Sequence, residues 1–154
     1  MKIRFGLGLG ADTPPDMLAA VVDQLEASGV DSLWFSELVS ADAVDPFVGM
    51  AYALARTTHL KVGTSVAVLP GRHPVLVAKQ LASLAGLAPK RVLPAFGLRS
   101  AIPAEREIFQ VPDGERAELT RRHLAAAPRC RTSHFVVPGL LGGNKPDHSP
   151  VGSS

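Results

Sequence analysis

Polar side chains follow three predicted strands at the point where each strand ends. One strand carries Thr64 and Ser65 and leads to His73, immediately before a proline-started helix. The segments Asp31–Glu37 and Val92–Arg99 read as strands that also end in polar residues. Because parallel strands of a β/α fold end at one rim, these side chains are expected to lie together there. A carboxylate, hydroxyls and an imidazole at one rim are suited to binding a ligand and moving protons.

Four apolar segments separated by helical patterns predict parallel strands. Their bounds are Ile3–Leu9, Asp31–Glu37, Leu60–Pro70 and Val92–Arg99. The units repeat at about thirty residues, the length that a strand, a crossover helix and two turns require. Pro94 lies inside the fourth segment, where it removes one ladder hydrogen bond and predicts a bulge.

Three helices are predicted between these strands. Thr13 and Asp45 each precede a proline, a combination typical of a helix start. The first helix is expected to end at Gly29, the second by His59, and the third begins at Pro74. Each helix carries an apolar stripe, formed by Leu18, Val21, Val22 and Leu25 in the first, by Phe47, Met50, Ala51 and Leu54 in the second, and by Val77, Ala78, Leu81, Leu84 and Ala85 in the third.

The pattern changes after about Glu115. Glu118–Ala127 is compatible with a short helix, whereas Pro128–Ser154 mixes Arg, Pro, Gly and Ser and predicts a poorly ordered tail. A closed barrel of eight βα units needs about 250 residues, so four units correspond to half of one. The pattern alone therefore leaves two architectures: a small open parallel α/β sheet, or half of a barrel.

The composition is that of one globular domain with a core, 46% hydrophobic over 154 residues. Gly, Pro or charged residues interrupt every apolar run well before the roughly 18 residues that a membrane span needs, and no signal-like segment opens the chain. A cytoplasmic location without membrane association is expected. Cys130 is the only cysteine, so an intramolecular disulfide is excluded, and no His or Cys cluster has the spacing of a metal site.

Charge is balanced over the predicted βα units. Ten Lys and Arg residues face ten Asp and Glu residues up to Val111, so the formal net charge of +2 comes from the remainder of the chain. A nucleic-acid-binding face needs clustered cations, which this neutral main part does not supply. A small-molecule substrate is the expected partner, and nucleic acid is not.

Several blocks of the sequence together resemble a known family. They are Asp31–Glu37, Asp45-Pro46-Phe47, Leu60–Pro70, Arg72-His73-Pro74 followed by Ala78-Lys79-Gln80, and Lys90–Gly97. In content, order and spacing they are similar to the N-terminal half of the bacterial luciferase-like flavin and deazaflavin oxidoreductases. Gly63-Thr64-Ser65-Val66 looks most like the branch that uses the deazaflavin coenzyme F420, which is found largely in actinobacteria. The resemblance covers Met1 to about Arg116.

The resemblance implies an α/β fold, the N-terminal half of a (β/α)8 TIM-type barrel with about four βα units. Residues 1–116 would form this partial barrel domain. Residues 117–154 would be a divergent, poorly ordered tail, because the sequence departs from the family where a barrel's next helix and strands should follow. The chain is thus expected to be a truncated member of the family, with its activity in question.

The resemblance also assigns roles to residues at the strand ends. Thr64, Ser65 and Val66 would form a bulge, often with a non-prolyl cis peptide, that supports the cofactor ring. Gly97 and Phe96 would bring the backbone close to the cofactor, and Arg99 would meet its phosphate-bearing tail. Glu37 and His73 are the candidate catalytic residues, with Glu37 orienting the substrate or acting as an acid or base. The alternatives are a solvated or paired strand end for Glu37 and a loop-capping role for His73.

Three positions depart from family patterns. Leu38 stands where a cofactor-contacting histidine would follow Glu37, so the resemblance supplies no histidine for proton donation there. Ser100 replaces the acidic residue of the sugar-phosphate dehydrogenase branch, which argues against that chemistry. The run Gly6–Gly10 is not a dinucleotide fingerprint, because its sixth position is Ala11, and it is read as a glycine-rich strand end at the rim.

These observations predict an oxidoreductase that transfers a hydride between F420 and a small organic substrate. One alternative is an FMN-dependent monooxygenase. Another is a non-catalytic half-barrel fragment or oligomerisation module. A half-barrel leaves two strand edges unpaired. A homo-oligomer is therefore expected for each of these three functions.

Overall fold

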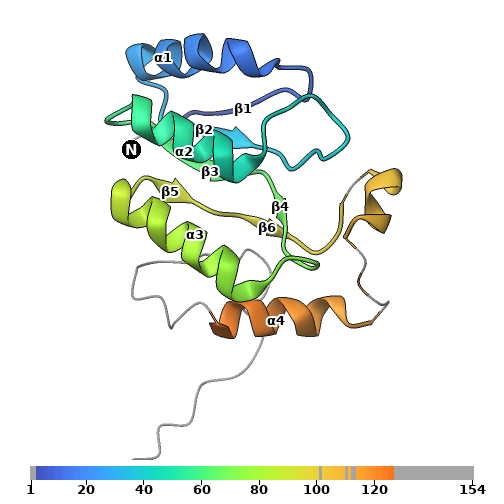
Figure 1. Cartoon of the computed structure of the whole chain (residues 1–154). Coiled ribbons are helices and arrows are strands. Elements are labelled where there is room, and N and C mark those ends of the chain that lie inside the picture. The colour runs from blue at the N-terminus through green and yellow to red at the C-terminus, as the bar shows by residue number, and fades with distance from the viewer. Residues whose placement is uncertain (1–2, 101, 110, 112–113, 127–154) are drawn as a thin grey trace, which may run out of the picture.

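The computed structural model describes residues 3–100, 102–109, 111 and 114–126. A four-stranded parallel sheet has the order β1 (Gly6–Gly8), β2 (Ser32–Phe35), β3 (Lys61–Thr64) and β5 (Val92–Leu93). A second, two-stranded parallel sheet joins β4 (Ala67–Val68) to β6 (Phe96–Gly97). The carboxyl ends of the strands, called the rim below, lie at the right of Figure 1.

Three helices cross between successive strands, as expected. These are α1 (Leu18–Ser28), α2 (Pro46–Arg56) and α3 (Pro74–Leu87), and they line up along the sheet in Figure 1. The Asp45 carboxylate caps α2 by accepting hydrogen bonds from the backbone N–H groups of Phe47 (2.9 Å) and Val48 (3.1 Å). Gly29 ends α1 in the left-handed conformation, with φ 73°.

The predicted start of the first helix is wrong by one turn. Pro14 precedes a second proline, and a residue before proline is pushed out of the helical region. Pro14 accordingly has ψ 147°, and a short 3-10 turn, η1 (Pro15–Met17), leads into α1 at Leu18. Thr13 therefore does not cap the helix. The first strand is likewise shorter than predicted, because only Gly6–Gly8 pair with β2.

The third and fourth predicted strands are each interrupted. Ser65 and Val66, called the β3–β4 bend below, separate β3 from β4 and are joined by a cis peptide bond. Pro94 and Ala95 separate β5 from β6, so the strand is irregular at Pro94, as predicted. The Thr64 hydroxyl bridges this gap, donating to the Ala95 carbonyl oxygen (2.5 Å) and accepting from the Ala95 N–H (2.8 Å).

The core lies between the sheet and the three helices. Leu33, Phe35, Val62, Val22 and Met50 are each 1% exposed or less. Gly49 lets α2 approach β2, since a Cβ there would lie 2.5 Å from the Phe35 ring. Burial of this apolar surface holds the helices on one face of the sheet.

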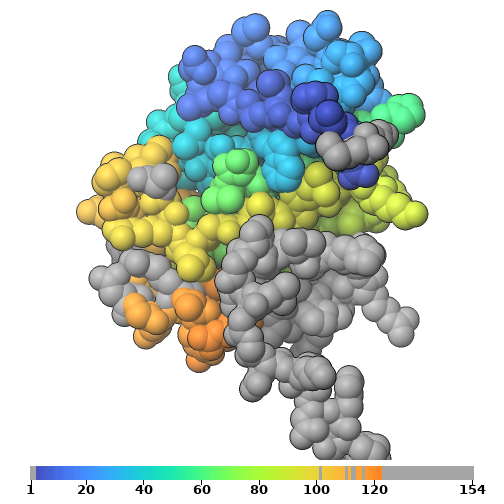
Figure 2. Space-filling model, turned by 180° about the vertical axis from the view of Figure 1, so that it is seen from behind, coloured from blue at the N-terminus to red at the C-terminus, as the bar shows by residue number. Residues whose placement is uncertain are grey.

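The other face of the sheet is lined by glycines and one indole. The Trp34 ring spans from β1 to β3, because a Cβ on Gly6 would lie 2.7 Å from its Nε1 and a Cβ on Gly63 would lie 2.6 Å from its Cζ3. The Trp34 Nε1–H donates to the Ser32 hydroxyl (2.9 Å). Figure 2 shows this side of the molecule, where segments near residues 60–75 (green) reach the surface between the N-terminal part (blue) and the β6 region (yellow).

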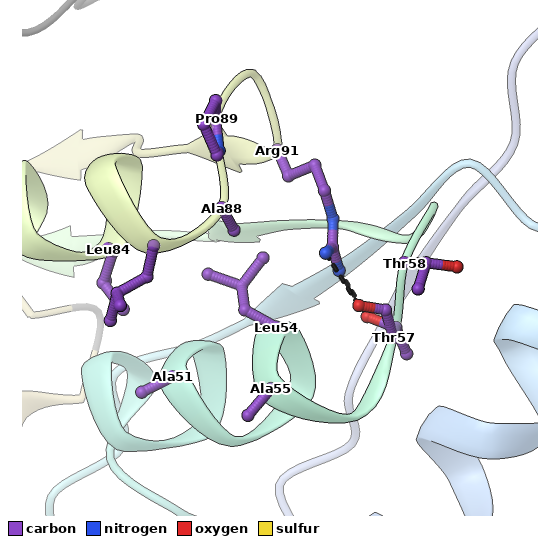
Figure 3. Close-up of a pocket in the computed structure, with 10 residues that line it drawn as sticks. Ala51, Leu54, Ala55, Thr57, Thr58, Leu84, Ala88, Pro89 and Arg91 are labelled. Carbon is purple, nitrogen blue, oxygen red and sulfur yellow. Dashed lines mark hydrogen bonds between the residues drawn. The ribbon is translucent and has the colours of Figure 1, made fainter.

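The end of the sheet opposite the rim is held by Arg91. Its guanidinium donates to the carbonyl oxygens of Leu60 (2.9 Å) and Thr57 (2.7 Å) and to the Thr57 hydroxyl. Beside it, a mainly apolar groove of about 570 Å³ runs between the C-terminal ends of α2 and α3 (Figure 3). A smaller polar cavity of about 240 Å³ lies near Arg4, Glu26 and Lys61. Both are remote from the predicted site.

The helix predicted at Glu118–Ala127 is present as α4 (Arg116–Ala126), which packs against α3. The tail predicted to be poorly ordered, Pro128–Ser154 with Cys130, lies outside the described residues. No helix within the described ranges is long and apolar enough to cross a membrane. In the same part of the chain, no group of three or more His, Cys, Asp or Glu residues is arranged to hold a metal ion.

Candidate functional site

The end of β2 fixes the β3–β4 bend from one side. The Ser65 N–H donates to the Phe35 carbonyl oxygen (2.7 Å), and the Ser36 hydroxyl donates to the Ser65 carbonyl oxygen (3.0 Å). The Glu37 N–H donates to the Val66 carbonyl oxygen (3.3 Å). Both bend carbonyls thus accept hydrogen bonds from the residues just after β2, while the side chains of Ser65 and Val66 are exposed at the rim.

The Glu37 carboxylate is buried behind the bend. Its side chain is 3% exposed, and it accepts hydrogen bonds from the Val68 N–H and from the Arg72 guanidinium. Arg72 also lies over the Phe47 ring at 5.2 Å and 3.8 Å from an Asp45 carboxylate oxygen. Burial lowers the pKa of Arg72 from its usual value. The structure therefore places Glu37 in a paired, enclosed position that ties β4 to the loop after it.

Two predicted cofactor residues, Thr64 and Gly97, shape the bend from within. Thr64 is fully buried, and its hydroxyl is committed to the backbone of Ala95. Gly97 lies against Val66, because a Cβ on Gly97 would come within 2.7 Å of the Val66 Cγ2. A larger residue at position 97 would displace Val66, so the strand end needs glycine for packing.

The other predicted residues lie around the same rim. Phe96 pairs with Ala67 in the small sheet and is partly buried, whereas Arg99 follows the strand with an exposed side chain. His73 precedes α3 and is exposed. Its carbonyl oxygen accepts hydrogen bonds from the N–H groups of Leu76 and Val77, both at 3.1 Å, but its imidazole makes no side-chain cap. His73 is thus the N-cap residue of α3 through its carbonyl group and not through its ring.

Sequence reasoning missed three residues that organise this rim. Ser36 and Arg72 stand inside the blocks that carried the resemblance, so their position beside predicted strand ends was a usable signal. Glu105 belongs to a charged stretch, Glu105-Arg106-Glu107, that is typical of a solvated surface. Nevertheless it is 1% exposed and is hydrogen bonded to Ser40 and Ser100. Nothing local in the sequence distinguishes it from its exposed neighbour Glu107.

At the rim, hydrogen bonds from the residues after β2 hold the backbone of the β3–β4 bend, and the side chains of the bend are exposed to solvent. Ser65 offers a hydroxyl, Val66 an apolar surface and Arg99 a cation. Such a surface can support a flat apolar ring and attract an anionic group attached to it. The side chains of Glu37 and Thr64 are hydrogen bonded to Arg72 and to the Ala95 backbone. They therefore stabilise the rim and are not directed toward a ligand.

The family model for luciferase-like monooxygenases matches residues 1–135. The chain belongs to the luciferase-like monooxygenase family. The match extends beyond Arg116, the last residue of the predicted partial barrel domain. It confirms the family resemblance that those blocks indicated.

Two curated relatives match a part of this chain. An uncharacterized protein of Mycobacterium tuberculosis is 30% identical over 115 residues, which cover 73% of this chain and 32% of the relative. An F420-dependent glucose-6-phosphate dehydrogenase of Kineococcus radiotolerans is 32% identical over 95 residues, covering 57% of this chain and 28% of that enzyme. The chain thus spans about a third of the length of the curated relatives that it matches.

Solved structures of two oxidoreductases share the fold. The oxygenating constituent of 3,6-diketocamphane monooxygenase from Pseudomonas putida, in complex with FMN, superposes with a TM-score of 0.72 at 21% identity, covering 82% of this chain and 38% of that chain. An F420-dependent secondary alcohol dehydrogenase gives a TM-score of 0.65 at 24% identity, covering 83% and 42%. The α/β fold with a parallel sheet is therefore that of these proteins, and the half-barrel truncation stays a prediction.

Proposed function

We propose that this chain carries the cofactor-binding part of an oxidoreductase that transfers a hydride between coenzyme F420 and a small organic substrate. The single observation that carries the proposal is the β3–β4 bend, whose two carbonyls accept hydrogen bonds from Ser36 and Glu37 while its side chains are exposed. The 32% identity to an F420-dependent dehydrogenase supports deazaflavin as the cofactor.

The described residues fit such a cofactor. Val66 and Phe96 supply apolar contact for a ring, and the exposed Arg99 supplies a positive charge for a phosphate-bearing tail. Deazaflavin, when bound, supplies the hydride chemistry, and the protein positions its ring and excludes competing reactions. The Thr64 and Ser36 hydroxyls hold the backbone behind the ring position through Ala95 and Ser65.

The two candidate catalytic residues take different roles in this proposal. Glu37 is a positioning residue, because its carboxylate is bonded to Arg72 and Val68 and keeps the strand end in place. A carboxylate paired with a guanidinium is a weak base, since the cation stabilises its ionised form. His73 is exposed at the rim and is the group we assign to proton exchange with substrate.

A cofactor titration tests the proposal directly. Trp34 is the only tryptophan and lies across the open face of the sheet, so its emission reports on a pigment bound at the rim. We expect F420 to quench this emission in a saturable way and more tightly than FMN. A matched Arg99→Ala variant should weaken F420 binding, whereas Arg56→Ala, remote from the rim, should not. Failure of F420 to bind, or Arg99→Ala and Arg56→Ala binding it alike, would contradict the assignment.

The second candidate function is that of an FMN-dependent monooxygenase. The fold match to an FMN complex at a TM-score of 0.72 favours it. Oxygen consumption with reduced FMN, together with tighter binding of FMN than of F420, would establish this alternative. If neither pigment binds, the chain is better described as a non-catalytic module of the fold.

A further inference from the structure

A buried carboxylate on η2 (Pro103–Glu107) joins two of the loops that surround the candidate site. Glu105 is 1% exposed. One carboxylate oxygen accepts hydrogen bonds from the Ser40 N–H (2.8 Å) and the Ser40 hydroxyl (2.7 Å), and the other accepts from the Ser100 hydroxyl (2.8 Å). Ser40 belongs to the loop after β2 and Ser100 to the loop after β6, so Glu105, Ser40 and Ser100 form a clamp between them.

The clamp is closed by further contacts on each side. The Ser100 hydroxyl accepts from the Ile102 N–H (3.1 Å), which fixes the rotamer that faces Glu105. The Arg106 Nε–H donates to the Ser100 carbonyl oxygen (3.4 Å). Every polar atom that Glu105 presents is therefore matched by a donor from a loop at the rim. A buried carboxylate with three donors is held far more firmly than an exposed one.

The same short segment also touches the third loop at the rim. A Cβ added to Gly71 would lie 3.4 Å from the Phe109 Cα, so the loop after β4 passes close to the end of η2. Gly71 has φ 90°, a conformation that favours glycine, and Phe109 is tied back through its N–H to the Glu105 carbonyl oxygen (3.4 Å). Thus the residues around Glu105 contact the loops after β2, β4 and β6, which all start at the candidate site.

The charge state of Glu105 agrees with this arrangement. Burial opposes ionisation, yet the hydrogen bonds from Ser40 and Ser100 hold the pKa of Glu105 below its usual value. The carboxylate is consequently ionised at neutral pH and acts only as an acceptor. Loss of that acceptor would leave the Ser40 N–H without its partner in a loop that borders Glu37.

We propose that Glu105 is a positioning residue for the cofactor site, whose carboxylate fixes the loops after β2 and β6 on either side of the β3–β4 bend. This inference rests on the proposed function for its ligand, a planar deazaflavin, but the clamp itself is a property of the chain. Opening the clamp releases both loops, and the ring then loses a defined orientation against Val66.

Two measurements on the full chain test the proposal. The first is hydrogen exchange of the Ser40 amide, which needs no cofactor. Glu105→Gln removes the negative charge and leaves a single, neutral acceptor oxygen, so the bonds from Ser40 lose their charge assistance, and we expect Ser40 exchange to accelerate about tenfold. Glu107→Gln changes an exposed neighbour on the same turn and should leave Ser40 exchange unchanged. Equal Ser40 exchange in the wild type and Glu105→Gln would overturn the clamp.

The second measurement is the visible circular dichroism of bound F420, which depends on how the ring is held. We expect Glu105→Gln to diminish this band and to weaken F420 binding about tenfold when both proteins are measured well below the lowered melting temperature of the variant. Faster Ser40 exchange with an unchanged band and affinity would make Glu105 purely structural and refute a positioning role. If F420 fails to bind even the wild type, the proposed function fails, and the Ser40 result still decides the clamp.

A milder pair of variants protects the test against misfolding. Ser40→Ala removes one donor but keeps the Ser40 N–H, whereas Ser100→Ala removes the hydroxyl that donates to the second carboxylate oxygen. We expect both to weaken the F420 dichroism less than Glu105→Gln does. A Ser100→Ala variant that matches the wild type in dichroism and in affinity would contradict the role of the loop after β6.

Discussion

The Glu37 carboxylate and the Arg72 guanidinium form an ion pair inside the rim, although 35 residues separate them in the sequence. Glu37 lies just after β2, and Arg72 lies in the loop after β4, so the pair links the segments that follow two strands bordering the β3–β4 bend. The Phe47 ring lies under the guanidinium at 5.2 Å, and the Glu37 side chain is 3% exposed. A desolvated pair of this kind fixes geometry more than it adds net stability.

Removal of Arg72 should therefore destabilise the chain strongly. Arg72→Met leaves the Glu37 carboxylate buried without its cation, which we expect to cost about 3 kcal/mol in the free energy of unfolding. Urea denaturation measures this cost, and Arg99→Met, at an exposed position, is the matched control. The double variant Glu37→Gln with Arg72→Met should recover part of the loss. Equal stability of Arg72→Met and the wild type would show that the pair does not hold the rim.

Proline at position 65 should abolish cofactor binding. The Ser65 N–H donates to the Phe35 carbonyl oxygen (2.7 Å), and Ser65→Pro removes this donor and fixes φ of the residue. Ser65→Ala keeps the amide and serves as the control that separates the backbone bond from the hydroxyl. Fluorescence titration with F420 measures both variants. A stable Ser65→Pro protein with wild-type affinity would remove the bend from the site.

Much of the fold is predictable because its signals are local. The Asp45-Pro46 pair, the glycine at position 29 and the proline at position 94 each act on their own backbone, and the structure places a helix cap, a helix end and a strand interruption there. The first helix start was missed because Pro14 and Pro15 act on each other. This error is also local, because the restriction on a residue before proline excludes Pro14 from the helix.

The organisation of the candidate site is predictable only in part. The resemblance placed Thr64, Ser65 and Val66 at one strand end, and the structure indeed bends the chain there. The hydrogen-bond partners of the buried polar side chains could not be predicted. Glu105 and Ser40 are 65 residues apart, so their contact depends on strand order and loop path rather than on any spacing in the sequence. An exposed Glu107 and a buried Glu105 look alike until the fold is known.

Acid should weaken the end of the sheet opposite the rim through Glu26. Burial opposes ionisation of this carboxylate, but the N–H groups of Thr58, Leu60 and His59 outweigh it and lower the pKa of Glu26 to about 2 from 4.5. Because the folded-state pKa is depressed, the stabilisation is present above about pH 4.5 and is lost as the pH falls toward 2.

We expect Glu26→Gln to lower the free energy of unfolding by about 2 kcal/mol at pH 7, less than the full shift implies because the side chain is 22% exposed. The difference between the variant and the wild type should shrink below pH 4.5. Denaturation curves at several pH values measure it, with Glu107→Gln as the control. A difference that stays constant down to pH 3 would mean that Glu26 does not act through its ionisation.

Self-association through the open edge of β1 is the remaining expectation. The backbone groups of Phe5 and Leu9 face β2, so the intervening Gly6 and Gly8 direct theirs away from it. Leu7 in this strand is 46% exposed, and Ile3 and Phe5 in the segment before it are 64% and 68% exposed. An apolar strand with an open edge and no inward charge is a site for pairing with another strand.

We propose a second copy of this chain as the partner, with the two β1 strands antiparallel about a twofold axis. In the register that pairs Gly6 with its counterpart, Phe5 of one protomer lies opposite Leu7 of the other, so the apolar side chains pack across the axis. Arg4 then lies opposite Gly8, where a Cβ would meet nothing within 4 Å and leaves room for the longer side chain. The edge is thus complementary to itself.

Leu7→Lys should convert this dimer into a monomer, because it places two charges opposite apolar side chains in the pairing region. Leu87→Lys, at an 83% exposed position on α3, is the matched control and should remain dimeric. Sedimentation velocity at low micromolar concentration measures both variants. A monomeric wild type that melts cooperatively would show that the described sheet is self-sufficient. A dimer that survives Leu7→Lys would place the interface elsewhere on the chain.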